Sequence, residues 1–191
     1  MSRRWPLIAL LLLAGCRSAE DDHLGAVDDF QLTERANRVV SRDDLKGKVW
    51  VAAFFFSRCA GPCSQVSAQM ARLQEQWAGR DVVLVSFTVD PDHDKPAVLR
   101  DYAARFQADP NRWLFLTGER DKVYGLIQNS FKLGVAQNEG AARKPGDEVL
   151  HSTRLVVVDR KGEKRGYFDA TDDAHMTKLT AKLAAVLREK Y

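Results

Sequence analysis

The sequence predicts an α/β fold with a mixed central sheet flanked by helices, and three observations lead to this prediction. Two continuous apolar runs, Val49–Phe56 and Val82–Val89, are typical of strands buried on both faces. A stretch with helical periodicity follows each run, as expected for parallel strands joined by helices. The last forty residues read as a hairpin and an amphipathic helix, which adds antiparallel strands to the parallel ones.

The first strand and helix flank a short loop. Gly47 supplies a turn before the strand Val49–Phe56. A helix is expected over Ser64–Trp77, ending before Gly79, because apolar residues recur there at helical spacing: Val66, Met70, Leu73 and Trp77.

The middle of the chain repeats this pattern of strand and helix. Val82–Val89 is the second strand, and the polar loop Asp90–Asp94 follows it. Pro96 begins a second helix, since proline is well tolerated at the first helical position. Trp113–Thr117 is predicted as a short third strand and Arg120–Gln128 as a third helix.

The C-terminal part begins after a polar loop over residues 138–148. Leu155–Val158 and Glu163–Phe168 are predicted to form a hairpin around the turn at residues 159–162. An amphipathic helix runs from about Asp172 to Leu187. This order of elements matches a thioredoxin-like fold that carries an extra helix.

The N-terminus reads as an export signal. Arg3 and Arg4 precede the apolar stretch Leu7–Leu13, which is far too short to span a membrane. The small residues before Cys16 make this segment similar to a bacterial lipoprotein signal, in which the cysteine is acylated. We therefore expect a signal peptide over residues 1–15, a tether over 16–29 and one folded domain over 30–191. The domain would be anchored to a membrane of the cell envelope by the lipid on Cys16 and would face the extracytoplasmic side.

Charge and length exclude several classes of function. The formal net charge is only +3, and lysines and arginines are scattered among acidic residues, which argues against a nucleic-acid-binding surface. No later segment is long and apolar enough to span a bilayer. About 160 residues are one domain's worth, and we expect a monomer.

Cys59 and Cys63 stand at the predicted junction between the first strand and the first helix. Pro62 suits the first helical position. Thiols near a helix N-terminus have a lowered pKa, and a thiolate is both a nucleophile for disulfide exchange and a soft metal ligand. The spacing therefore permits a redox pair or two metal ligands. A purely structural disulfide is the weaker alternative, because so short a loop gains little from closure.

Of the four histidines, His151 is the candidate third ligand. It precedes the predicted strand Thr153–Val158, an edge that a thioredoxin-like fold places against the turn that carries the cysteines. His23, His93 and His175 are expected to be solvated surface residues.

Several segments together resemble the Sco/SenC family of membrane-tethered, thioredoxin-like copper proteins. The resemblance runs from about Asp29 to Leu187, and it rests on these residues: Gly47-Lys48, Phe54-Phe55-Phe56, Cys59-x-x-x-Cys63, Thr88-Val89-Asp90-Pro91, Trp113-Leu114-Phe115-Leu116-Thr117-Gly118 and His151-Ser152-Thr153.

The resemblance implies that Cys59, Cys63 and His151 bind one copper ion as Cu(I) or Cu(II). The protein would then be a metallochaperone rather than an enzyme. It would assist assembly of the copper centre of cytochrome c oxidase, and its partner would be the subunit that carries this centre or another copper-protein client. The resemblance implies that it does so either by delivering copper or by reducing the client's cysteines.

The sequence departs from the family pattern at three positions. Ala60 and Ser64 follow the cysteines where the family usually has proline, and Leu150 precedes the histidine where an acidic residue is common. Loss of a carboxylate that orients a ligand weakens metal binding about 10–100-fold.

Two other thioredoxin-like classes are alternatives. A general thiol-disulfide oxidoreductase would use Cys59 and Cys63 as its redox pair, but such proteins place a proline before the strand that faces the disulfide, and residues 149–153 contain none. A peroxidase of the peroxiredoxin kind expects a Pro-x-x-x-Thr-x-x-Cys sequence, which residues 55–59 do not supply. Metal binding through His151 is favoured over both.

Overall fold

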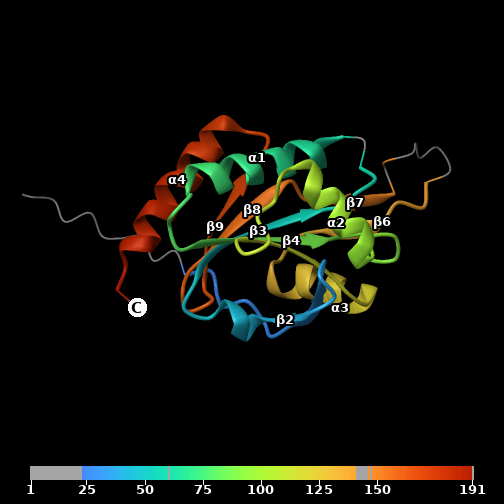
Figure 1. The fold of residues 1–191 in the computed structure, drawn as a ribbon, viewed down its shortest axis with the longest axis horizontal. Helices are drawn as coiled ribbons and strands as arrows, with labels where there is room; N and C mark the ends of the chain where they lie inside the picture. Colours follow the sequence, from blue (N-terminus) through green and yellow to red (C-terminus); the bar gives the residue numbers. More distant parts are fainter. Residues whose placement is uncertain (1–22, 60, 141–145, 147, 191) are drawn as a thin grey trace, which may run out of the picture.

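A seven-stranded mixed sheet forms the centre of the protein (Figure 1). The computed structural model describes residues 23–59, 61–140, 146 and 148–190. The strand order is β2-β1-β5-β4-β3-β8-β9. The strands are β1 (Gln31–Glu34), β2 (Val39–Ser41), β3 (Val49–Phe55), β4 (Val82–Thr88), β5 (Trp113–Thr117), β8 (Arg154–Val158) and β9 (Lys164–Asp169).

The three central strands are parallel and the outer strands are antiparallel. β4 pairs in parallel with β3 and β5, whereas β8 pairs antiparallel with β3, and β1 pairs antiparallel with β5. Every residue of β3 is buried, which explains why this strand reads as one continuous apolar run. The predicted mixed sheet and thioredoxin-like α/β fold are confirmed.

Helices cover both faces of the sheet. α1 (Pro62–Gln76) and α4 (Asp173–Arg188) lie on one face, and α3 (Arg120–Gly125) lies on the other (Figure 1). α2 (Pro96–Arg105) packs beside α1, where the hydroxyl groups of Tyr102 and Ser67 form a buried hydrogen bond of 2.8 Å. Short helical turns η1 (Arg42–Leu45) and η2 (Leu126–Ser130) complete this set.

The core is rich in aromatic side chains. Phe54 of β3 contacts Phe87 of β4 and Phe131, with ring centroids 5.8 and 5.1 Å apart. On the other side of the sheet, Phe55 stacks on Tyr102 at 4.8 Å. These contacts fix the end of β3, and the cysteine-bearing loop begins there.

The structure differs from the sequence-based expectation in several places. The third helix is α-helical only to Gly125 and continues as the π-helical turn η2. β1 and β2 were not predicted, because they are only four and three residues long. The expected tether at residues 16–29 is partly packed: Val27 is fully buried, and its N–H donates to the carbonyl of Gly162 at 2.8 Å.

None of the helices in the part of the chain that the structure describes is long and apolar enough to cross a membrane.

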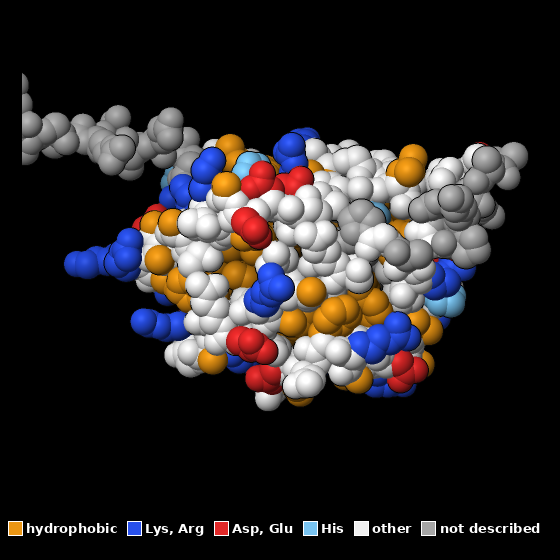
Figure 2. Space-filling view, turned by 90° about the horizontal axis from the view of Figure 1, so that it is seen from above, with side chains coloured by type: hydrophobic (Ala, Val, Ile, Leu, Met, Phe, Trp, Pro, Cys, Tyr) orange, Lys and Arg blue, Asp and Glu red, His pale blue; other side chains and the backbone are white. Residues whose placement is uncertain are grey.

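Figure 2 shows the face that α1 and α4 cover. Basic and acidic side chains of the described residues are interspersed on this face.

Candidate metal centre

The loop between β3 and α1 carries Cys59 at the surface end of the core. Cys59 is half-buried and packs against the hydrophobic core. Gly61 is the N-cap of α1 and Pro62 is its first residue, as the sequence predicted. The backbone of Cys63 therefore lies in the first turn of α1, near the partial positive charge of the helix terminus, while the placement of its side chain lies outside what the structure describes.

His151 is the last residue of a separate short strand. β7 (Val149–His151) pairs antiparallel with β6 (Val135–Gln137), and Val135 lies opposite His151 in this two-stranded sheet. The sequence predicted that His151 lies ahead of the strand over residues 153–158, and β8 (Arg154–Val158) does follow it. The strand β7, which ends at His151 and pairs with β6, was not predicted.

The ring of His151 is oriented by its neighbour. Nδ1 of His151 lies 3.0 Å from the carbonyl oxygen of Ser152. Because a carbonyl oxygen only accepts, Nδ1 carries the proton in this hydrogen bond. In the tautomer that makes this hydrogen bond, the lone pair lies on Nε2, the arrangement that a metal-binding histidine needs.

Phe56 links the cysteine loop to His151. The N–H of Cys59 donates to the carbonyl of Phe56 at 3.3 Å. The Phe56 ring meets the His151 ring edge-to-face, with centroids 5.6 Å apart and planes at 82°. Two of the three candidate ligands thus contact the same buried residue. The N-terminal end of α1 and the β6–β7 pair also lie at the same end of the molecule (Figure 1).

Asp94 anchors the start of the cysteine loop. Its buried carboxylate accepts hydrogen bonds from the backbone N–H of Ser57 at 3.0 Å, from the Ser57 hydroxyl and from the Thr88 hydroxyl at 2.5 Å. Burial raises the pKa of Asp94 above its ordinary value, and the hydrogen bonds from Ser57 and Thr88 partly oppose that rise. The carboxylate therefore holds the loop two residues before Cys59.

The donor set suits copper. Thiolate sulfur and imidazole nitrogen together are ligands that Cu(I) and Cu(II) accept. Among the side chains that the structure describes, no three His, Cys, Asp or Glu residues surround a common centre. Cys63 lies outside that set, so the predicted trio of Cys59, Cys63 and His151 stays a prediction, and Phe56 supplies the contact between two of its members.

The other predicted site residues lie elsewhere. His23 and His93 are exposed, as expected. His175 is not simply solvated, because its Nδ1 accepts the backbone N–H of Asp169 at 3.0 Å beside the N-terminus of α4. The proposed lipidation site, Cys16, lies outside the described residues.

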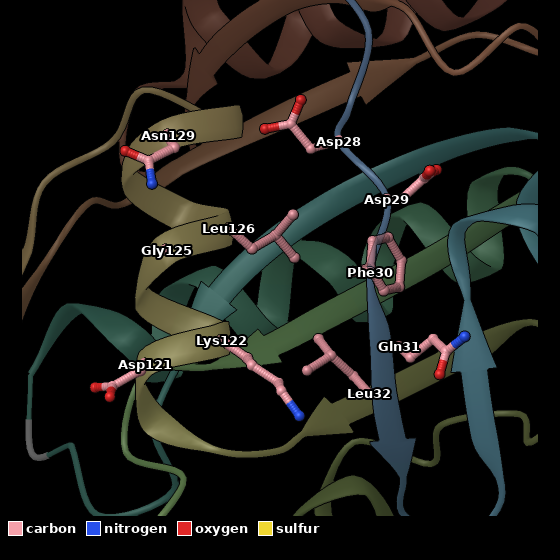
Figure 3. Close-up of a pocket in the computed structure, with 10 residues that line it drawn as sticks. All are labelled: Asp28, Asp29, Phe30, Gln31, Leu32, Asp121, Lys122, Gly125, Leu126 and Asn129. Atoms are coloured by element: carbon pink, nitrogen blue, oxygen red, sulfur yellow. The ribbon is translucent and has the colours of Figure 1, made fainter.

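A cavity of about 420 Å³ lies on the opposite face of the sheet, away from the cysteine loop (Figure 3). It opens between the chain leading into β1 and the helical segment α3–η2. Phe30, Leu32 and Leu126 form its apolar walls, and Asp28, Asp121 and Lys122 lie around it. The cavity includes none of the predicted ligands.

Sequence reasoning missed two residues that shape the site. Phe56 looked like one more apolar residue of the strand, although β3 ends at Phe55. Arg58 looked like an ordinary surface cation, yet it pairs with Asp90 at 2.5 Å and with Glu148 at 3.8 Å. The sequence did offer one indication that Arg58 belongs to the site: it stands directly before Cys59.

The domain has a thioredoxin-like fold, with Cys59 in the loop before α1, Cys63 in the first turn of α1 and His151 on the neighbouring β6–β7 pair. Its class is that of thioredoxin-like proteins with thiol and imidazole side chains at one end of the domain. The SCO1/SenC family model matches residues 18–188. The chain belongs to the SCO1/SenC family.

Similar proteins of this family come from bacilli. The SCO1 protein homolog of Bacillus subtilis is 34% identical over 161 residues, which are 82% of this chain and 81% of that protein. The crystal structure of a SCO1/SenC family lipoprotein from Bacillus anthracis is 29% identical, with a TM-score of 0.75 over 84% of this chain and 94% of that one. BsSco, a Sco family cytochrome c oxidase assembly protein in which a disulfide switch was identified, is 28% identical, with a TM-score of 0.75 over 86% and 95%.

Proposed function

We propose that this protein is a membrane-tethered copper chaperone that binds one copper ion through Cys59, Cys63 and His151. The copper is cargo, to be passed to the copper centre of cytochrome c oxidase or to another copper protein. The observation that carries the proposal is the shared contact with Phe56, because it brings His151 of β7 beside the loop of Cys59. Membership of the SCO1/SenC family supports it.

Each proposed ligand has a distinct part in holding copper. Cys63, in the first turn of α1, and Cys59, in the loop before it, would bind as thiolates favoured by the helix N-terminus. Two thiolates suit Cu(I). The Nε2 atom of His151 would add the nitrogen ligand that Cu(II) favours. The half-buried position of Cys59 leaves the site within reach of a client protein.

Reduction of client cysteines is the second candidate function. The disulfide switch of the 28% identical BsSco favours it. In that reaction the two thiols of Cys59 and Cys63 would give two electrons and two protons to a client disulfide. The client would leave with two thiols, and a Cys59–Cys63 disulfide would form in this chain.

The proposed location is a membrane of the cell envelope, with the domain facing the periplasm or another extracytoplasmic space. A lipid on Cys16 would supply the anchor, with a short tether between it and the residues that pack near Val27. The Bacillus anthracis relative, at 29% identity, is a lipoprotein. Residues 1–15 would be removed as the signal peptide.

Anaerobic copper titration of the reduced full-length chain in mild detergent tests the proposal. We expect one copper per chain in the wild type and loss of Cu(II) binding in His151→Ala. The exposed His93 offers a control, and His93→Ala should bind copper as the wild type does. Absence of tight copper binding, together with a readily exchanged disulfide, would contradict the chaperone proposal and support the reductase.

A further inference from the structure

We propose that Arg58 is a positioning residue that ties the loop of Cys59 to the hairpin of His151. Its guanidinium group contacts the carboxylates of Asp90 and Glu148, which come from two different parts of the chain. The inference rests on the proposed copper site, because its importance lies in the distance between a thiolate and an imidazole. It assigns a role to a residue that neither holds copper nor reacts.

The carboxylate of Asp90 ties Arg58 to the central sheet. Nε and Nη2 of Arg58 lie 3.2 and 2.5 Å from the same carboxylate oxygen, Oδ2 of Asp90. Asp90 lies two residues after the end of β4 and is buried, and its own N–H donates to the Thr88 hydroxyl at 3.0 Å. The cation next to Cys59 is therefore held by a rigid carboxylate at the end of β4.

The contact with Glu148 reaches the hairpin. Nη1 of Arg58 lies 3.8 Å from Oε1 of Glu148, while Oε2 of Glu148 accepts the N–H of Gly146 at 2.9 Å. The carbonyl of Glu148 accepts the N–H of Asn138 at 2.9 Å, which continues the pairing of β6 and β7. Glu148 lies directly before β7, and His151 is three residues further along the chain at the end of that strand, so the ion pair acts on the segment that carries His151.

Arginine suits this position because of its shape as well as its charge. Three nitrogens of one planar group reach two carboxylates, whereas a lysine ammonium is a single point charge on a flexible stem. Without a cation, the carboxylates of Asp90 and Glu148 would repel each other across the gap between loop and hairpin. The contact of the Phe56 ring with the His151 ring would remain between the loop and the hairpin.

The test compares four single variants and the double variant Arg58→Gln/Glu148→Gln with the wild type, all as the full-length chain in mild detergent. Arg58→Gln removes the cation. Arg58→Lys keeps the positive charge but removes the planar guanidinium group, and Glu148→Gln removes the carboxylate of the hairpin. Arg120→Gln is the matched control: Arg120 is 43% exposed, close to the 41% of Arg58, and it pairs with Asp92 of the same loop without touching the cysteine segment. Each variant is examined by Cu(II) titration, by the sulfur-to-copper charge-transfer band, by thermal unfolding and by amide hydrogen exchange.

We expect Arg58→Gln and Glu148→Gln each to weaken Cu(II) binding about tenfold or more and to change the charge-transfer band. The double variant should lose no more than either single one, because both remove the same link. Arg58→Lys should resemble Arg58→Gln, and Arg120→Gln should resemble the wild type. All four should unfold within a few degrees of one another. Additive losses, or full rescue by lysine, would overturn the bridging role.

Amide hydrogen exchange tests the link through Arg58 independently of whether the protein binds copper. If the wild type binds no copper, the copper proposal fails, but the link between loop and hairpin remains measurable. Faster exchange at both residues 57–59 and 149–151 in Arg58→Gln, and in neither segment of Arg120→Gln, supports the link. Unchanged exchange in Arg58→Gln overturns it even if copper binds.

Discussion

Replacing Phe56 with leucine should weaken the copper site more than it weakens the fold. Phe56 is 1% exposed and contacts both halves of the candidate centre. Leucine keeps the residue apolar and fills most of the space, but it removes the ring that orients His151. We therefore expect Cu(II) affinity to fall about tenfold, in the range found when a group that orients a ligand is lost.

The effect on stability can be worked from the same contacts. A hydrophobic exchange of similar volume costs less than about 1.5 kcal/mol. Loss of one edge-to-face ring pair adds about 0.5–1.5 kcal/mol. Phe56→Leu should thus lower the free energy of unfolding by about 0.5–3 kcal/mol. The protein should remain folded if its stability lies in the usual range of about 5–15 kcal/mol.

Phe54 provides the matched control for this experiment. It is also 1% exposed, but its ring pairs are with Phe87 and Phe131 rather than with His151. Phe54→Leu loses two ring pairs and should destabilise the protein at least as much as Phe56→Leu, yet leave Cu(II) binding unchanged. Urea unfolding and anaerobic Cu(II) titration measure the two effects. Equal copper affinity in Phe56→Leu and the wild type would refute the orienting role of Phe56.

Three further predictions concern ligands, pH and the anchor. His151→Ala should lose Cu(II) binding while the thiolate pair retains Cu(I), measured by competition with chelators for each ion; unchanged Cu(II) affinity would remove His151 from the site. Because burial raises the pKa of Asp94, the native state keeps a proton that the unfolded state has lost above about pH 3.8. The contribution of this proton to the free energy of unfolding is complete below that pH and declines as the pH rises toward the native pKa. In Asp94→Asn, the free energy of unfolding measured with urea should therefore lack this decline. The same decline with pH in the variant and in the wild type would contradict the prediction. Cys16→Ser should release the protein from membranes into the soluble fraction, and continued sedimentation with membranes would argue against a lipid on Cys16.

The sequence predicted the parts of the fold that are long and strongly patterned. β3 and β4 are buried on both faces, and α1 repeats its apolar residues at helical spacing, so their signals are local and unambiguous. The short strands β6 and β7 were missed because three residues carry no periodicity, and their pairing depends on each other across an intervening loop.

The candidate site shows the same division. The two cysteines could be placed from the strand and helix around them, and Pro62 marked the helix start. The position of His151 relative to them could not be derived locally, because it depends on the pairing of β7 with β6. Its contact with Phe56 and the pairing of Arg58 with Glu148 join residues about ninety positions apart, and such contacts leave no pattern in a single sequence.

Copper K-edge X-ray absorption of the anaerobically loaded full-length protein tests the central claim most directly, because it counts the atoms bound to the metal. The account predicts two sulfur ligands at about 2.3 Å, a distance typical of metal thiolates, and a nitrogen ligand that disappears in His151→Ala. A nitrogen ligand that persists in His151→Ala, or copper bound without two sulfurs in the wild type, would contradict the proposed site.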